Sequence, residues 1–317
     1  MSIAYEQLLN PEQLRVVREG DGPSLVLAGA GSGKTRTIVY RVAYLLEQGV
    51  RPSEILLLTF TNKAAKEMLS RVTDLLGAPP AGLWGGTFHH IANRFLRSFA
   101  PHLGYGAHFT ILDAEDSREL LRACTKEAGI DPAMKRFPSP AVLQGMWSFS
   151  RNACRPFSEV LEEKHPRFLD SAGKLADIFN RYEAKKRAGN CMDFDDLLTN
   201  AAAILRDPGI RERLAKQFRF ILVDEYQDTN RIQAEIVSSL ASIHKNILVV
   251  GDDAQSIYSF RAAEVRNILH FPRMFPGAKI FRLETNYRST PEILELANTV
   301  IANNANQFPK TLRPVLA

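Results

Sequence analysis

Five short, nearly continuous apolar runs recur along the chain, and they constrain its fold more than any other feature. They lie at residues 24–28, 55–59, 219–223, 246–250 and 279–283. Apolar runs of this length are typical of strands that are covered on both faces, as in a parallel sheet. The segments 34–47 and 62–75, which follow the first two runs, have the apolar spacing that predicts helices. Strands that alternate with helices predict an α/β fold with a parallel sheet.

The middle of the chain lacks such runs. From about Asp113 to Gly189 the apolar residues recur at helical spacing, and no buried strand is indicated. Residues 170–188 predict a helix that follows an N-cap at Asp170 and ends at Gly189. We therefore expect an all-α insertion within an α/β domain whose sheet resumes near residue 219. A length of 317 residues fits about two domains.

Composition excludes several classes of protein. Hydrophobic residues make up 45% of the chain and charged residues 24%, with 19 Gly and 17 Pro, so a disordered, collagen-like or coiled-coil protein is not expected. No apolar run approaches the roughly 20 residues that span a bilayer, and the N-terminus lacks a secretory signal. The three cysteines lie far apart, as expected of reduced thiols. We expect a soluble, cytoplasmic protein.

The charge balance says less about partners. Forty Lys and Arg residues against 35 Asp and Glu residues give a net charge of +5, which permits a polyanionic partner without requiring one. A solvated surface of mixed charge is the simpler interpretation. The short basic cluster Lys185-Lys186-Arg187 favours a solvated helix end over a binding site.

The sequence AGAGSGKT at residues 28–35 lies directly after the first predicted strand and opens the first predicted helix. Its glycines let the backbone curl so that N–H groups converge on phosphate oxygens, and the helix N-terminus adds its positive dipole. Lys34 would bring a positive charge to the β- and γ-phosphates, and the Thr35 hydroxyl can bind Mg²⁺. The alternative is a Gly-rich turn before a buried helix.

The strict form of this pattern has Gly where this chain has Ala28, a small residue that still suits the turn. The residues expected to contact phosphate are Ala28, Gly29, Ala30, Gly31, Ser32, Gly33, Lys34 and Thr35.

Two later strands end in polar residues that complement this loop. Asp224 and Glu225 follow the strand at 219–223, at the edge where a parallel sheet binds its ligands. Asp224 can hold Mg²⁺ through water, and Glu225 can polarise the attacking water as a general base. The alternative for such an acidic pair is a helix N-cap. Gln255 follows the strand at 246–250 and can sense the γ-phosphate or orient that water.

Eight segments in order carry a resemblance to a known family. They are LNPEQ (9–13), AGAGSGKT (28–35), TFTNKAA (59–65), GTFHHIANRFLR (86–97), DFDDLL (193–198), VDEYQDTN (223–230), VVGDDAQSIYSFRAA (249–263) and LETNYRS (283–289). Together they resemble the UvrD/Rep/PcrA group of superfamily 1 DNA helicases, from about residue 9 to residue 290. The resemblance implies a P-loop NTPase fold of the RecA-like type. The implied domains are a first motor domain at 1–110 and 190–283, a helical insertion at 111–189, and the start of a second motor domain at 284–317.

The resemblance also implies residue roles in a site for ATP and Mg²⁺. Gln13 would read the adenine edge, Tyr287 would stack on the base, and Arg36 would support the nucleotide. Arg288 would reach the γ-phosphate as an arginine finger. Their local sequences leave alternatives open: Gln13 as a residue of a first helical turn, Tyr287 as a core aromatic, and Arg288 as a surface ion pair.

For single-stranded DNA the resemblance points to Phe60, Thr61, Asn62, His89, Tyr258, Phe260 and Arg261. Aromatic stacking and polar backbone contacts hold single strands without sequence preference, at about 1–3 kcal/mol per stacked base. Phe60 and Phe260 can instead be core aromatics, and His89 a satisfied core histidine. The family usually has Trp at the position of Phe260 and often Arg at that of Ser259, so we expect a weaker grip on the strand.

The function that the resemblance implies is ATP-driven 3′-to-5′ translocation on single-stranded DNA and at single-strand/duplex junctions. The family carries further motifs and a second motor domain, whereas this chain stops at Ala317. We therefore expect the N-terminal part of a longer helicase, monomeric and without a membrane partner, that binds ATP and DNA but does not unwind alone. Two alternatives stay open: a short ATP-binding DNA clamp or regulator without motor activity, and the helicase subunit of a recombination nuclease.

Overall fold

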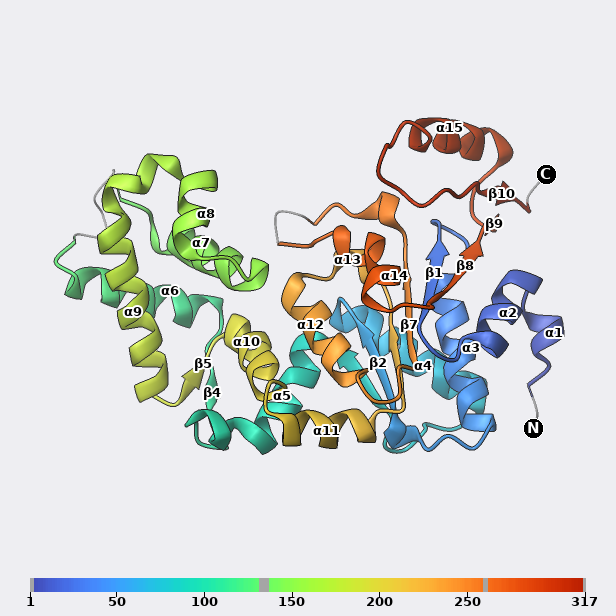
Figure 1. The fold of residues 1–317 in the computed structure, drawn as a ribbon, viewed down its shortest axis with the longest axis horizontal. Helices are drawn as coiled ribbons and strands as arrows, with labels where there is room; N and C mark the ends of the chain where they lie inside the picture. The colour runs from blue at the N-terminus through green and yellow to red at the C-terminus, as the bar shows by residue number, and fades with distance from the viewer. Residues whose placement is uncertain (1–2, 131–136, 259–261, 316–317) are drawn as a thin grey trace. The chain divides into compact units, whose positions relative to one another are not determined.

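The computed structural model describes residues 3–130, 137–258 and 262–315 of the chain (Figure 1). The chain forms two compact units. The first comprises Met1–Ile91, Pro208–Thr229 and Val237–Ala317, and the second comprises Ala92–Asp207 and Asn230–Ile236. The second unit is longer than the segment 111–189 that the sequence assigns to a helical insertion, and the domain limits stay a prediction.

The first unit contains a six-stranded sheet with the order β3-β2-β6-β7-β1-β8. Its strands are β1 (Ser24–Ala28), β2 (Ile55–Thr59), β3 (Trp84–Thr87), β6 (Phe220–Val223), β7 (Ile247–Gly251) and β8 (Lys279–Leu283). Every neighbouring pair is parallel, and β1 lies between β7 and β8. The predicted α/β fold with a parallel sheet is therefore confirmed, and all five apolar runs form its strands.

The edge strand β3 was not predicted from the sequence. Its residues, Trp84-Gly85-Gly86-Thr87, contain no apolar run, yet they pair in register with β2. A Cβ added at Gly85 would lie 2.6 Å from Cδ2 of Leu69. Leu69 belongs to helix α4 (Asn62–Leu76), so Gly85 lets this helix approach the sheet closely. Close packing by α4 therefore explains why this strand has glycine at position 85 and contains no apolar run.

Helices α3 (Lys34–Glu47) and α4 occupy the segments that the sequence predicts to be helical. The other helices within the first unit are α1 (Tyr5–Leu8), α2 (Pro11–Glu19), α11 (Pro208–Gln217), α13 (Arg266–Leu269), α14 (Phe271–Met274) and α15 (Pro291–Ile301), with short 3₁₀ helices η1 (Pro52–Glu54), η4 (Tyr226–Asp228) and η5 (Asp253–Gln255). Two short strands, β9 (Thr285–Asn286) and β10 (Arg313–Pro314), form a separate parallel pair. Helices α5 (Phe88–Phe99) and α12 (Arg231–Leu240) contain residues of both units.

The core of the first unit forms between the sheet and the helices beside it. The buried face of α3, including Ile38 and Val42, packs with Val26 of β1, Leu57 of β2 and Leu222 of β6. Because these strand residues are fully covered, the sheet gives the loops at its strand ends a rigid base. This packing fixes the loop between β1 and α3, where the Gly-rich sequence lies.

The second unit is mainly helical. Its elements are η2 (Ala100–Leu103), β4 (Thr110–Ile111), α6 (Ala114–Glu127), α7 (Pro140–Ala153), α8 (Phe157–Lys164), η3 (Pro166–Ser171), α9 (Ala172–Ala188), β5 (Cys191–Met192) and α10 (Phe194–Ile204). Trp147 stacks on Phe179 with ring centroids 4.6 Å apart in its core. Within the described residues of the whole chain, no helix combines the length and apolar character needed to cross a membrane.

Two expectations for α9 need correction. The N-cap at Asp170 is wrong, because η3 occupies this position and α9 begins only at Ala172; Gly189 does follow the last helical residue as predicted. The solvated helix end is wrong for Lys186, which is buried and lies 2.7 Å from Asp193 and 2.6 Å from Asp196. Burial opposes the charge on Lys186, but the neighbouring carboxylates raise its pKa above the ordinary value and keep it protonated.

Candidate active site

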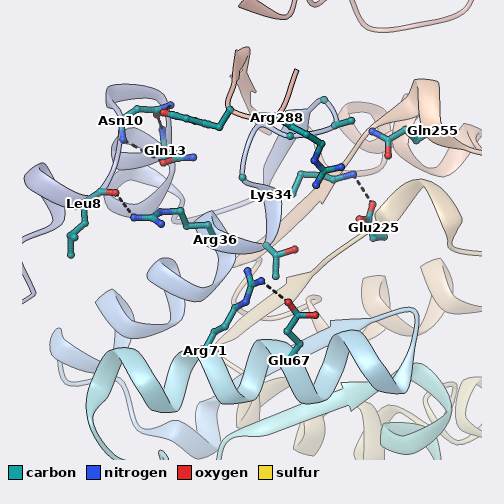
Figure 2. A pocket seen from close by; sticks show the side chains of 16 residues that line it. Leu8, Asn10, Gln13, Lys34, Arg36, Glu67, Arg71, Glu225, Gln255 and Arg288 are labelled. Carbon is teal, nitrogen blue, oxygen red and sulfur yellow. Dashed lines mark hydrogen bonds and ion pairs between the residues drawn. The ribbon is translucent and has the colours of Figure 1, made fainter. Parts of the chain in front are cut away.

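A pocket of about 740 Å³ lies where β1 and β6 end in the first unit (Figure 2). Its walls are Leu8, Asn10, Gln13, Gly29, Ala30, Gly31, Gly33, Lys34, Thr35, Arg36, Glu67, Arg71, Glu225, Gln255, Tyr287 and Arg288. Twelve of these residues are among those predicted from the sequence to bind the nucleotide or to act on it. The other three predicted residues, Ala28, Ser32 and Asp224, are adjacent in sequence to residues that line the pocket. They are buried and do not line it themselves.

The loop between β1 and α3 needs glycine at two positions. Gly31 and Gly33 have φ values of 73° and 87°, in the left-handed region that L-residues rarely adopt. A Cβ added at Gly33 would lie 2.6 Å from Nε2 of Gln13, and one at Gly31 would lie 2.8 Å from Nδ2 of Asn286. Gly33 caps α3 without a side-chain hydrogen bond, so backbone N–H groups of the first turn stay available to an anion.

Two side chains of α3 meet the acidic pair that follows β6. Lys34 Nζ donates to Oε2 of Glu225 at 2.8 Å, and Thr35 Oγ1 donates to Oδ2 of Asp224 at 3.2 Å. Figure 2 shows the Lys34 side chain pointing toward Glu225 across the pocket. The structure thus brings together two pairs of adjacent residues that are about 190 positions apart in sequence, as their predicted roles require.

The environment of Asp224 disfavours its negative charge. Burial, followed by the charge of Glu225, raises the pKa of Asp224 to about 6 from 3.8, although Lys34 and the Thr35 hydroxyl oppose this shift. Glu225 has φ 52° and ψ 47°, a left-handed conformation that costs a non-glycine residue of order 1–3 kcal/mol. Strain and unfavourable burial of charge are typical of sites that bind a cation or a reacting group.

Gln227, which the sequence analysis missed, connects the acidic pair to the end of β7. Its Nε2 donates to Oε2 of Glu225 at 2.8 Å, and its Oε1 accepts from the backbone N–H of Asp252 at 3.0 Å. A Cβ added at Gly251 would lie 2.5 Å from this Oε1, so Gly251 makes room for the bridge. Gln255 Nε2 donates to Oδ2 of Asp252 at 2.6 Å. Asp252 therefore contacts both glutamines.

The opposite side of the pocket contains Gln13 and Tyr287, which are expected to bind the base, and Arg36, which is expected to support the nucleotide. Gln13 lies in the first turn of α2, where it completes a capping box with Asn10, and its Nε2 also donates to the Ser32 carbonyl at 3.0 Å. Gln13 therefore both occupies the first turn of a helix and contacts the Gly-rich loop. Tyr287 is 46% exposed, so it is not a core aromatic, and its hydroxyl accepts from Nδ2 of Asn10 at 2.8 Å. Arg36 donates to the Leu8 carbonyl at 2.6 Å (Figure 2).

Arg288 is exposed at the pocket and follows a buried asparagine that the sequence analysis did not single out. Asn286 Nδ2 donates to the Ala30 carbonyl of the Gly-rich loop at 2.6 Å. Its Oδ1 accepts from the backbone N–H groups of Arg288 and Ser289, each at 2.8 Å. Asn286 thus ties the turn that carries Arg288 to the Gly-rich loop.

Five of the seven residues expected to bind DNA lie within the described chain, and none of these five lines the pocket. Phe60 and Tyr258 stack on each other with centroids 5.5 Å apart and planes 28° apart. Thr61 and Asn62 are exposed at the start of α4, where the Thr61 side chain accepts from the backbone of Ala64. Phe260 and Arg261 lie outside the described residues. His89 is half-buried on α5, and burial lowers its pKa, so the ring is neutral at pH 7.

Comparison with known proteins gives the family. The model of the UvrD/REP helicase N-terminal domain matches residues 9–276. The chain belongs to this family. It is 41% identical over 308 residues to the ATP-dependent DNA helicase PcrA of Bacillus subtilis (strain 168), covering 96% of this chain and 41% of that protein. The corresponding PcrA proteins of Staphylococcus epidermidis (strain RP62A) and Staphylococcus aureus (strain Mu50) are 41% and 40% identical, again over 96% of this chain and 41% of theirs.

The UvrD/REP family match covers the Gly-rich loop, the acidic pair and Gln255, but it ends before Tyr287 and Arg288. The place of these two residues in the pocket is thus an observation of the structure, independent of the family match. The chain spans about two fifths of the length of the curated relatives it matches, 41% in each case.

Proposed function

We propose that the pocket binds ATP with Mg²⁺ and hydrolyses it, and that the chain is the ATP- and DNA-binding part of a DNA helicase. The observation that carries this proposal is the meeting of the Gly-rich loop with the acidic pair: Lys34 lies 2.8 Å from Glu225, and Thr35 lies 3.2 Å from Asp224. Membership of the UvrD/REP family supports the same function.

The residues around Lys34 fit the chemistry of phosphate transfer. The Lys34 ammonium pairs with Glu225, and a bound γ-phosphate would offer it a second anion at the same place. This exchange would free the Glu225 carboxylate to accept a proton from the attacking water. Gln255 would orient that water, and Arg288 would neutralise charge that develops on the γ-phosphate.

Asp224 and Thr35 fit a magnesium ion. Both offer hard oxygen donors, and Mg²⁺ in nucleotide sites is held by one or two protein oxygens together with phosphates and water. The 3.2 Å contact between them places both oxygens beside the Gly-rich loop, and burial raises the pKa of Asp224, an effect that a bound cation would oppose. When bound there, Mg²⁺ would neutralise negative charge on the phosphate oxygens.

For the nucleotide base we propose contacts with Gln13 and Tyr287, and we propose that Arg36 supports the nucleotide; all three residues line the pocket. For single-stranded DNA we propose Phe60, Thr61, Asn62, His89 and Tyr258, together with Phe260 and Arg261. The stacked pair Phe60–Tyr258 offers aromatic faces of the kind on which bases stack. Because His89 is neutral, its contact would be a hydrogen bond or a stack and not an ion pair.

Movement along DNA is a proposal for the longer helicases that this chain resembles. The relatives are named ATP-dependent DNA helicases, and this chain spans about two fifths of each of them. We propose 3′-to-5′ translocation, binding at single-strand/duplex junctions, and a monomeric state for residues 1–317. We further propose that these residues alone do not unwind a duplex.

The proposal is tested by steady-state ATP hydrolysis with Mg²⁺, with and without oligo-dT, for residues 1–317 and for Lys34→Ala. We expect slow hydrolysis that Lys34→Ala abolishes, and no unwinding of a 3′-tailed duplex. Hydrolysis that is equal in the wild type and Lys34→Ala would refute the site. Unwinding by residues 1–317 would refute the proposed need for more of the motor, while leaving the site intact.

A further inference from the structure

Beyond the family motifs, the chain returns to the ATP pocket after α15. This return segment, residues 307–313, is fixed by several hydrogen bonds. The backbone N–H of Phe308 donates to Oδ2 of Asp253 at 3.0 Å, and Arg282 Nε donates to the Pro309 carbonyl at 3.0 Å. Leu312 exchanges two hydrogen bonds with the Asn298 side chain, at 2.9 and 3.0 Å. Figure 1 shows β10, which ends this segment, beside β9.

Lys310 lies at the centre of the return segment. Its Nζ is 2.7 Å from Oδ1 of Asp252 and 2.5 Å from Oδ1 of Asp253, and its side chain is only 6% exposed. Both aspartates are themselves buried. Burial opposes the charge of Lys310, but the two carboxylates outweigh this effect and raise its pKa. Lys310 therefore forms ion pairs with two adjacent buried carboxylates, at the start of the short segment that leads to Gln255.

Asp252 links Lys310 to the pocket. One of its carboxylate oxygens accepts from Lys310 at 2.7 Å, and the other accepts from the Gln255 amide at 2.6 Å. The backbone N–H of the same residue donates to Gln227, whose amide donates to Glu225. A continuous path of hydrogen bonds thus runs from the return segment to the side chains assigned to the attacking water.

We propose that Lys310 is a positioning residue for ATP hydrolysis, which holds Gln255 in place through Asp252. The inference rests on the proposed function of the pocket, and it assigns a role to a residue outside the matched range 9–276. Without the ammonium group, Asp252 and Asp253 would repel each other in a buried place, and Asp252 would move or take up a proton. Either change alters the partner that orients the Gln255 amide.

The variant Lys310→Gln tests this role, with Lys310→Arg as the conservative substitution. Lys279→Gln is the matched control, because Lys279 donates to the Glu19 carbonyl at the surface and does not line the pocket. The readouts are kcat and KM for ATP, and the affinity for a fluorescent ADP analogue, which lacks the γ-phosphate. We expect kcat to fall about 10- to 100-fold in Lys310→Gln, the cost of a small misplacement at a reacting centre. ADP affinity should stay within about twofold, Lys310→Arg should recover most of kcat, and the control should match the wild type.

A double-mutant cycle keeps the test decisive if Lys310→Gln folds poorly. Asp252→Asn removes the charge at the other end of the contact, so the double variant contains no unpaired Asp252 carboxylate. If Lys310 acts through Asp252, the two substitutions have less than additive effects on kcat. Additive effects would overturn the proposal.

The other outcomes separate this inference from the function on which it rests. A wild-type kcat in folded Lys310→Gln would refute the inference alone. Equal losses of kcat, ADP affinity and thermal stability in both Lys310→Gln and Lys310→Arg would show a purely structural tether and would also refute it. If the wild type neither hydrolyses ATP nor binds nucleotide in a way that Lys34→Ala weakens, the proposed function fails, and the role of Lys310 fails with it.

Discussion

Replacing Asp224 with Asn should make the protein more stable while abolishing its metal-dependent ATP hydrolysis. The pKa of Asp224 is about 6 in the folded state against 3.8 ordinarily, because the carboxyl is buried beside Glu225. The folded chain thus binds this proton more tightly than the unfolded chain does. The contribution of this carboxyl group to stability is therefore fully present below pH 3.8 and is lost as the pH rises through about 6.

The size of the effect follows from the shift of about two pKa units. At about 1.4 kcal/mol per unit, the ionised carboxylate costs about 3 kcal/mol at pH 7.5, and the same linkage gives about half of that at pH 5. Asn keeps an oxygen that can accept from the Glu225 backbone N–H, which donates to Asp224 at 3.0 Å. The amide is neutral at every pH, so the substitution removes the cost of the charge.

The assay is chemical denaturation of the nucleotide-free protein at pH 7.5 and at pH 5. Asp74→Asn, at an exposed position of α4, is the control for removing a carboxylate and should change stability by less than about 0.5 kcal/mol. The expected gain for Asp224→Asn is about twice as large at pH 7.5 as at pH 5. A gain that is absent at pH 7.5, or that does not depend on pH, would refute the electrostatic account of this site.

Three further predictions concern other parts of the site. Gly33→Ala should weaken ATP binding at least about tenfold in a fluorescence titration, because its Cβ would lie 2.6 Å from Gln13 Nε2 at a φ of 87°; unchanged affinity would contradict the loop geometry. Gln227→Ala should lower kcat about tenfold at nearly constant KM, because Glu225 loses a donor at 2.8 Å; a change in KM alone would contradict this role. His89→Gln should leave the salt dependence of oligo-dT binding unchanged in fluorescence anisotropy, because burial keeps His89 neutral; a slope reduced by about one would indicate a charged phosphate contact.

The parts of the site that the sequence predicts are those whose signals are local. The run at 24–28 and the glycines after it predict both β1 and the start of α3 at Lys34, because a strand, a tight turn and a helix N-terminus each leave a short pattern. Asp224 and Glu225 were found in the same way, as acids directly after an apolar run. Their convergence follows from the rule that parallel strands present their ends at one edge of the sheet.

The parts that the sequence analysis missed depend on partners far along the chain. Asn286 contacts a carbonyl 256 residues away, and Lys310 contacts an aspartate 57 residues away. A lone lysine or asparagine carries no local pattern that names such a partner. Lys186 was misread for a different reason: the carboxylates that hold it are only 7 and 10 residues away, but they belong to the start of the next helix. The edge strand β3 was missed because it contains no apolar run; its residue Gly85 makes room for close packing by α4.

The central claim, that the Gly-rich loop and the acidic pair form one nucleotide site, is tested most directly by calorimetric titration with a non-hydrolysable ATP analogue. The titration is made with and without Mg²⁺, on the wild type, Lys34→Ala and the surface variant Lys279→Gln. We predict saturable binding at one site, weakened at least about tenfold by loss of Mg²⁺ or of the Lys34 ammonium and unaffected by Lys279→Gln. Absence of saturable binding, or equal binding by Lys34→Ala, would contradict the account.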